Sequence, residues 1–536
     1  MGFHDQIKSL STKKQHSILS ASLVLAITFG LSAVLGFLRS RFLYAQFFNC
    51  CVLELDAYNA AFRLPDLIFK LLVTGALSAS FIPVFSSYLH KDEKKAYEVA
   101  STVINLLLIF FTIASVTVLI FAKPLSGIIA HGFTPDQIDL MTNLTRILLV
   151  AQIFFLISNF LTGMLQVHQV FVVPALSPIV YNIFIILSIF FLVPSFGIYG
   201  VAIGCVIGAF FHLLIQIPVA RALKVKYSFT IQPKLAGVGE VVRLMIPRSL
   251  SLGLGEIENT VTLFFASSLT AGSISLLNLA LQLMYLPSRI FGTTVGQASL
   301  PMLSKNIARN EMDIFRNTVR KTISQSLFIA VPITVLVLVH RLAIIRIAFG
   351  AKQFPWGATL LTAKTLAYLT PAIVSQAVIQ ILVRAFYAIH DTKTPLKISF
   401  FSLLVNVVSS FLFVNYTDMG ILGLAISASL GNLTQCFGLF YSFIKIVDGA
   451  GWEKTIMHYF KIIVASAVLG FTSWSCMRFF DMFVLDTSRT LNLIILSSIS
   501  VVISLVFYYY TAKVLNISEV DDYRHYFRKS TAFFRK

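Results

Sequence analysis

Charged residues are scarce in this sequence of 536 residues, where Asp, Glu, Lys and Arg together make up 12%. Soluble domains contain about 25% charged and about 45–50% apolar residues, whereas 57% of this chain is hydrophobic. A soluble protein of this length needs a polar surface that these residues cannot provide. The composition therefore excludes a soluble enzyme and a disordered chain, and it predicts an all-α polytopic membrane protein.

Acidic residues are rarer than basic ones, with 23 Asp and Glu against 42 Lys and Arg, so the formal net charge is +19. A basic excess can bind nucleic acid, but in so apolar a chain the positive residues more often lie on cytoplasmic loops. We therefore expect no nucleic-acid partner.

Cysteines and recognisable catalytic motifs are also few. The five cysteines are odd in number and contain no C-x-x-C, so they predict small packing residues and not a structural bridge or a zinc site; they are Cys50, Cys51, Cys205, Cys436 and Cys476. There is no P-loop, G-x-G-x-x-G, G-x-S-x-G or H-E-x-x-H. ATP-driven pumping and hydrolysis by those motifs lose support, and we expect no enzyme activity and no cofactor.

Long charge-free runs are abundant instead. A membrane-spanning helix needs about 20 apolar residues, and the longest run, residues 147–220, is long enough for three spans. Other charge-free runs lie at 99–122, 259–288, 398–417, 419–444 and 490–512, and shorter candidates at 20–45, 58–88, 239–268, 322–345, 357–383 and 458–480. Split at their breaks, these runs predict about fourteen transmembrane helices.

The basic residues recur on alternate loops, as expected when the N-terminus is cytoplasmic. They lie at Lys91, Lys94 and Lys95; Arg221, Lys224, Lys226 and Lys234; Lys305, Arg309, Arg316, Arg320 and Lys321; Lys393 and Lys397; Lys445 and Lys454; and from Arg524 to Lys536. The other loops are acidic, neutral or weakly charged, except around Arg341, Arg346 and Lys352. Both termini are therefore predicted to be cytoplasmic.

The two halves of the chain resemble each other at an offset of roughly 220 residues. The segment 82–86 (IPVFS) returns at 300–304 (LPMLS), and 197–203 (GIYGVAI) returns at 420–426 (GILGLAI). An offset of six helices keeps the orientation, so this is a parallel repeat, one of the transporter architectures. It predicts a cytoplasmic N-terminus (1–16), two six-helix lobes (17–230 and 231–450), a C-terminal helix pair (451–514) and a basic tail (515–536).

Ionisable residues inside predicted spans cluster on the first two helices of each lobe. Such residues are costly in a membrane and usually face a cavity or a partner. On the second helix, Arg63, Asp66 and Lys70 recur at helical spacing, so they share one face, and Pro65 interrupts that helix. The other members of the set are Arg39, Asp56, Arg248, Glu256, Glu258 and Arg289.

This distribution predicts a central polar cavity with a net positive lining, which suits an anionic headgroup such as a diphosphate. The carboxylates of Asp66, Glu256 and Glu258 are candidates for coupling an ion. Pairing within the protein is the alternative, through Arg63–Asp66 and Arg248–Glu256, and Arg39 and Arg41 could also extend to the outer interface. Away from the cluster, His168 and His212 are interpreted as packing residues, and Arg384 and Asp391 as flanking an ordinary turn.

Four segments carry a family resemblance: 32–39 (SAVLGFLR), 56–66 (DAYNAAFRLPD), 75–83 (GALSASFIP) and 385–395 (AFYAIHDTKTP). They are similar to the signatures of bacterial lipid II flippases, the MurJ/MviN family of the multidrug, oligosaccharidyl-lipid and polysaccharide exporter superfamily. The similarity extends from about residue 17 to about residue 512.

The resemblance implies a fourteen-helix transporter of the bacterial cytoplasmic membrane that moves lipid II outward by alternating access. Lipid II is the undecaprenyl-diphosphate-linked peptidoglycan precursor. The resemblance also implies that the last two helices hold the lipid tail. Independently of it, we expect the membrane potential or a monovalent ion to drive transport, with membrane lipids and cell-wall synthesis proteins as partners.

Carried over by position, Arg39 matches a family arginine that contacts substrate, and Asp56 matches the family aspartate after the first helix. Three other family arginines are replaced here by Ala33, Phe69 and Gln282. Lys70, Arg248 and Arg289 lie near those positions, so either they compensate or the headgroup is held differently.

Other functions compete with this interpretation. The chain could transport another undecaprenyl-diphosphate-linked oligosaccharide. A cation-coupled drug exporter of the same superfamily should carry carboxylates toward a cationic substrate, which a positive cavity disfavours. A membrane enzyme acting on polyprenyl diphosphates would need clustered Asp or His at a membrane face. A scaffold without transport would have no use for charges on a broken helix.

Overall fold

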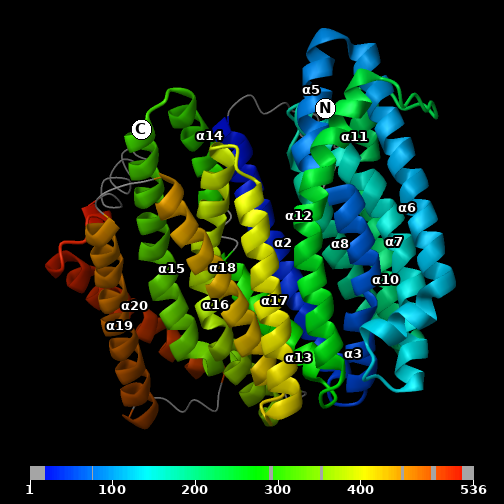
Figure 1. Ribbon diagram of the computed structural model, residues 1–536. Helices are drawn as coiled ribbons and strands as arrows, with labels where there is room; N and C mark the ends of the chain where they lie inside the picture. Colours follow the sequence, from blue (N-terminus) through cyan, green and yellow to red (C-terminus); the bar gives the residue numbers. More distant parts are fainter. Residues whose placement is uncertain are drawn as a thin grey trace, which may run out of the picture. The chain divides into compact units, whose positions relative to one another are not determined.

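The computed structural model describes residues 18–74, 77–288, 292, 294–350, 354–447, 452–483 and 490–521. Across these ranges the secondary structure is helical and contains no β-strand. The described chain forms two compact units that divide between Ser275 and Leu276 (Figure 1). The predicted all-α class is therefore confirmed, whereas the predicted lobe boundaries stay a prediction.

The first unit contains a series of α-helices and two short π-helices. They are α2 (Ile18–Phe47), α3 (Val52–Ala61), α4 (Arg63–Phe69), η1 (Lys70–Thr74), η2 (Leu77–Phe81), α5 (Ile82–Lys91), α6 (Glu93–Ile129), α7 (Pro135–Val167), α8 (Val172–Phe191), α9 (Val193–Phe196), α10 (Ile198–Leu214), α11 (Ile217–Ala222) and α12 (Ala236–Ser267).

The division between the units falls within α13 (Ser273–Ser288), and the second unit continues with α14 (Thr294–Ala308), α15 (Met312–Phe349), α16 (Trp356–Ala388), α17 (Lys393–Tyr416), α18 (Ile421–Val447), α19 (Trp452–Phe483) and α20 (Thr490–Val514). The C-terminal pair α19 and α20 packs against α15. Tyr508 of α20 donates a hydrogen bond to the carbonyl of Phe328 at 2.8 Å.

Ten helices of the described chain are long and apolar enough to cross a membrane. The four other predicted spans correspond to α2, the segment from α3 to α5, α12 and α13, which carry most of the predicted intramembrane charge. The polytopic membrane class is thus confirmed, and the count of fourteen stays a prediction.

The predicted basic loop from Lys305 to Lys321 is largely helical. Helix α15 has 38 residues and begins at Met312, so Arg316 and Arg320 lie within its first turns and not in a loop. At 1.5 Å per residue this helix is about 57 Å long, against about 30 Å for the hydrocarbon core of a bilayer. The prediction placed the helix start too late because it counted only the apolar residues, whereas the helix continues beyond them.

Local backbone geometry supports the internal repeat. Gly197 and Gly420 precede α10 and α18, and both have positive φ, at 55° and 51°. At the ends of α7 and α16, Gln169 and His390 also have nearly identical positive φ, at 62° and 61°. The residue after each donates its backbone N–H five positions back, as in a Schellman-type helix end. Equivalent positions of the two halves therefore adopt equivalent turns.

Replacing Gly197 by Ala is expected to lower the free energy of unfolding by about 1–2 kcal/mol, because its φ of 55° with ψ of −139° is strained for a residue with a Cβ. Unfolding in mixed detergent micelles measures the change. Gly239→Ala is the control, since a Cβ there meets no atom within 4 Å inside α12. It should be neutral or stabilising. Equal stability of the Gly197→Ala variant and the parent would contradict the positive φ that the structure gives Gly197.

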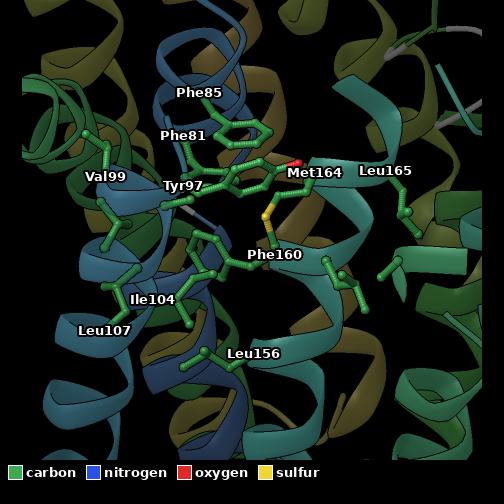
Figure 2. Close-up of a cluster of buried hydrophobic side chains, with 14 of the residues drawn as sticks. Phe81, Phe85, Tyr97, Val99, Ile104, Leu107, Leu156, Phe160, Met164 and Leu165 are labelled. Atoms are coloured by element: carbon green, nitrogen blue, oxygen red, sulfur yellow. The ribbon is translucent and has the colours of Figure 1, made fainter. Parts of the chain in front are cut away.

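Each unit has its own apolar core. In the first unit, Phe81 lies between Phe85, at a ring-centroid distance of 5.5 Å, and Phe160, at 4.9 Å (Figure 2). The neighbouring Tyr97 ring directs its hydroxyl to Nε2 of His168 at 3.0 Å. This core fixes α5, α6 and α7 around the two π-helices.

Both histidines predicted to be packing residues have polar partners. His168 pairs with Tyr97, and Nδ1 of His212 lies 2.7 Å from Oγ of Ser158. The cysteine prediction is wrong for one pair, because the turn after α2 joins Cys50 and Cys51 as a vicinal disulfide. Among the described residues, the other three cysteines are free thiols.

Candidate functional site

The second predicted span is broken, as Pro65 indicated. Helix α3 ends at Ala61 and α4 begins at Arg63. Because Pro65 has no N–H, the carbonyl of Ala61 four residues earlier loses its helical partner. The hydroxyl of Thr145 on α7 donates to that carbonyl at 3.1 Å. A side chain of a neighbouring helix thus satisfies the backbone group that the proline frees, which a membrane interior requires.

Immediately after α4 the chain changes from an α-helix to a π-helix, beginning at Lys70. Such π-helical turns are rare in proteins, and those that occur often lie at functional sites. Helix α12 supports this turn: Ser249 donates a hydrogen bond to the carbonyl of Leu71 at 2.5 Å, and Gly253 leaves room for the Leu71 side chain. The π-turn brings Lys70 against α12.

Lys70 forms an ion pair with Glu256 of α12, with Nζ 2.7 Å from Oε1. The Glu256 side chain is 8% exposed and that of Lys70 is 39% exposed. Asn259, one turn later on α12, donates a second hydrogen bond to Oε1 at 3.3 Å. The alternative Arg248–Glu256 ion pair therefore does not form. These two residues are eight positions apart on α12, about 12 Å along the helix, too far for a contact of neighbouring turns.

Asp66 lies one turn before Lys70 and accepts a hydrogen bond from Nε2 of Gln152 at 3.1 Å. Lys70, Arg63 and Glu256 all lie within electrostatic range of its carboxylate. The alternative Arg63–Asp66 ion pair does not form, and within the described chain Nε of Arg63 is buried without a hydrogen-bond partner. Arg63 is thus a cation whose Nε–H donates no hydrogen bond among the described residues.

Asp56 is engaged by the turn between α12 and α13. Its Oδ2 accepts the backbone N–H of Gly272 at 2.6 Å, and its Oδ1 accepts the backbone N–H of Ser275 at 2.9 Å and its hydroxyl at 2.6 Å. The first N–H groups of a helix have no partner within the helix. Gly272, with φ of 89°, has no side chain to cap α13, so Asp56 of α3 supplies the cap from outside.

The remaining predicted site residues are dispersed. The Arg39 guanidinium of α2 lies 6.0 Å from the ring centroid of Tyr181. Arg248 is exposed on α12, and Glu258 is partly buried on the same helix. Arg289 falls outside the described residues. Phe69, which stands where the family has arginine, packs against Phe155 with ring centroids 6.3 Å apart.

Arg63, Asp66, Lys70 and Glu256 thus form one group on α4, η1 and α12, with two cations and two anions. We call it the four-charge cluster. With all four groups ionised its charges balance, so the positive character predicted for the lining depends on Arg39, Arg248 and Arg289 against Glu258. Among the described residues, no group of three or more His, Cys, Asp or Glu could hold a metal ion. An incoming anion would meet the unpaired guanidinium of Arg63 directly, whereas at Lys70 it would have to replace Glu256.

Sequence reasoning missed the neutral members of this site: Gln152, Thr145, Ser249 and the turn at Gly272 and Ser275. Gln152 left a weak signal, because it is a polar side chain within the longest charge-free run. The others left none, since Ser, Thr and Gly are common in membrane helices and their partners lie far away in the sequence.

Comparisons with known proteins agree with this architecture. The sequence model of the family described as "Lipid II flippase MurJ" matches residues 51–493. A probable lipid II flippase MurJ of Bdellovibrio bacteriovorus is 27% identical over 92% of this chain and 94% of its own. The lipid II flippase MurJ of Burkholderia cenocepacia is 26% identical over 79% of this chain and 84% of its own.

Solved structures show the same fold. A lipid II flippase MurJ in an inward closed conformation superposes with a TM-score of 0.75 at 24% identity, covering 92% of this chain and 99% of that one. An inward-facing multidrug resistance transporter of the MATE family gives a TM-score of 0.65 at 16% identity, covering 79% and 98%. Because the family model covers most of the sequence, the chain belongs to the lipid II flippase MurJ family.

Proposed function

We propose that this protein moves lipid II from the inner to the outer leaflet of the bacterial cytoplasmic membrane by alternating access. The observation that carries the proposal is the family match over residues 51–493, together with ten candidate membrane spans among the residues that the structure describes. The charges of α2, α4, η1 and α12 supply what a diphosphate headgroup requires, namely guanidinium and ammonium donors at membrane depth. The process is transport without covalent chemistry.

The Lys70–Glu256 pair gives this site two states. With no anion present, Glu256 neutralises Lys70 and holds η1 against α12. A diphosphate that approaches Lys70 and Arg63 competes with Glu256 for the same ammonium group, and the released carboxylate must find another partner or a cation. Substrate binding therefore changes the contact between two helices, which is the differential interaction that a conformational cycle needs.

The membrane potential and an ion are the proposed energy sources. Each elementary charge that crosses the full field is worth about 2.3 kcal/mol per 100 mV. With a negative cell interior, the sign favours outward movement of an anion. Asp66, Glu256 and Glu258 are the carboxylates proposed to couple a monovalent cation. The proposed orientation places both termini in the cytoplasm, from the basic loops, and cell-wall synthesis proteins are the proposed partners.

Depletion of the protein in its own cell, followed by measurement of lipid II accessible at the outer leaflet, tests the function directly. We expect outer-leaflet lipid II to fall while the total pool remains or rises. Unchanged outward exposure would overturn the flippase proposal. Accumulation of a different undecaprenyl-diphosphate-linked oligosaccharide would assign the alternative substrate.

Arg39→Ala is expected to lose complementation in the depleted cell, because it removes the arginine that matches the substrate-contacting position of the family. Arg41→Ala is the matched control, since it removes the same charge from the same helix but two residues along, on the opposite face. Both variants should accumulate to the parent level on immunoblots. Full complementation by Arg39→Ala would show that this residue does not contact the substrate here.

A further inference from the structure

Helices α17 and α18 pack against each other and leave a groove of about 670 Å³ along one side of their interface. Figure 1 shows the two helices next to each other. Lys397 and Phe401 line the groove from α17, and Leu430, Thr434, Phe437 and Gly438 line it from α18. None of these residues belongs to the four-charge cluster, so the groove is a separate feature.

The groove is built into the helix pair. A Cβ at Gly438 would lie 2.9 Å from Cγ2 of Ile398, so the glycine lets α17 approach and Ile398 close the groove floor. Hydrogen bonds hold the two helices on their facing sides: Ser402 donates to the carbonyl of Gly431 at 2.9 Å, and Gln435 donates to the hydroxyl of Ser399 at 2.8 Å. These contacts fix which sides of the two helices face each other along the groove.

The groove walls are apolar and open. Phe401 is 59% exposed and Phe437 is 66% exposed, on opposite sides of the groove. From Gly438 to Leu430 the wall extends over eight residues, about 12 Å along α18. Aromatic and aliphatic walls of this length fit part of one fatty acyl chain lying along the helices.

Positive charge gathers at one end of the groove. Lys397 lines it one turn from the start of α17, and Lys445 lies in the last turn of α18. A short turn joins the helices, so the start of α17 and the end of α18 are on the same side of the membrane. Asp391 is the nearby acid, but its carboxylate accepts the backbone N–H groups of Lys393 and Thr394 at 3.0 Å each. It caps the start of α17 and acts electrostatically on Lys397, but among the described residues it forms no ion pair with Lys397 or Lys445, so both ammonium groups can take another anion.

We propose that this groove binds an anionic glycerophospholipid, with one acyl chain between α17 and α18 and the phosphate at Lys397. Charge complementarity selects this occupant, because an apolar channel that ends at exposed lysines matches a lipid with an acidic headgroup. In the proposed orientation the site opens to the cytoplasmic leaflet. The inference goes beyond lipid II transport, and only the assignment of the leaflet rests on that proposed function.

Quenching of tryptophan fluorescence by brominated acyl chains tests the site. The full chain carrying Phe401→Trp is placed in nanodiscs of phosphatidylcholine with increasing fractions of brominated phosphatidylglycerol, and the signal of the parent, which has three tryptophans, is subtracted. Brominated phosphatidylcholine is titrated in parallel. One basic residue near the surface is worth about 1 kcal/mol, so the anionic lipid should quench at about fivefold lower mole fraction.

Charge variants of the reporter complete the test. Lys397→Gln should abolish most of the fivefold preference, and Lys397→Arg should keep it. Lys513→Gln is the matched control, because Lys513 is an exposed lysine in the last turn of α20, away from the groove. Equal quenching by the two lipids would show ordinary boundary lipid and overturn the proposal, as would an unchanged preference in Lys397→Gln. Absence of quenching by either lipid would show that protein covers the groove, which also overturns it. No outcome depends on lipid II transport.

Discussion

Asp56→Asn is expected to lower the free energy of unfolding by about 2–3 kcal/mol, measured by unfolding in mixed detergent micelles. The Asp56 side chain is buried, and its two oxygens accept three hydrogen bonds from Gly272 and Ser275. An amide has only one oxygen, so its NH₂ group would face a backbone N–H. Hydrogen bonds to a charged acceptor are worth about 1.5–3 kcal/mol each, and leaving a buried N–H without a partner adds a further cost.

Glu54→Gln is the matched control for this substitution. Glu54 lies in the first turn of the same helix α3, and it is more exposed than Asp56. Its replacement should change stability by less than about 0.5 kcal/mol. If Asp56→Asn were as stable as the parent, Asp56 would not be the cap of α13, and the three hydrogen bonds would not contribute.

The same variant separates two roles for Asp56. The family resemblance proposes a substrate contact, whereas the structure engages the carboxylate with the turn before α13. If Asp56 contacts the substrate directly, the folded Asp56→Asn variant should bind lipid II more weakly than the parent. A cap would lower stability and leave the affinity of the folded fraction unchanged. Titration of the purified variant with lipid II, at denaturant concentrations where it stays folded, distinguishes the two roles. We expect unchanged affinity and lower stability, as for a helix cap.

Much of the fold could be predicted because it depends on local composition. The apolar runs predicted the helices, and the two glycine motifs of the repeat predicted the equivalent turns that the structure has at Gly197 and Gly420. The break at Pro65 was predictable from the missing N–H alone. The prediction for Cys50 and Cys51 was wrong because a disulfide depends on the geometry of one turn, which composition does not show.

The candidate site was predicted only in part. Spacing on one helix placed Arg63, Asp66 and Lys70 on a shared face, and the structure brings them together. The ion partner of Lys70 was not predictable, because it lies 186 positions away and depends on which face of α12 meets η1. That contact follows from Ser249 and Gly253, whose small side chains allow close packing but carry no signal in a single sequence.

Lys70→Met is expected to lower the free energy of unfolding by about 2 kcal/mol and to abolish complementation. It leaves the carboxylate of Glu256, whose side chain is 8% exposed, without its cation. Breaking a fully buried pair costs about 3–5 kcal/mol, and the partial exposure of Lys70 reduces that value here. Glu256→Gln should cost less, because its amide oxygen can still accept from the ammonium group.

The double variant Lys70→Met/Glu256→Met separates folding from transport. Replacing both members of a buried ion pair by apolar residues of similar size is often neutral for stability, so the double variant should unfold like the parent. It should still fail to complement, because the variant lacks the Lys70 ammonium group that binds the diphosphate. The exposed pair Lys123–Asp139, with a separation of 2.6 Å, is the control. Its double replacement should retain transport and change stability by less than about 1 kcal/mol. A stable Lys70/Glu256 double variant that complements fully would show that the pair only holds η1 against α12, and that the exchange of partners is not part of transport.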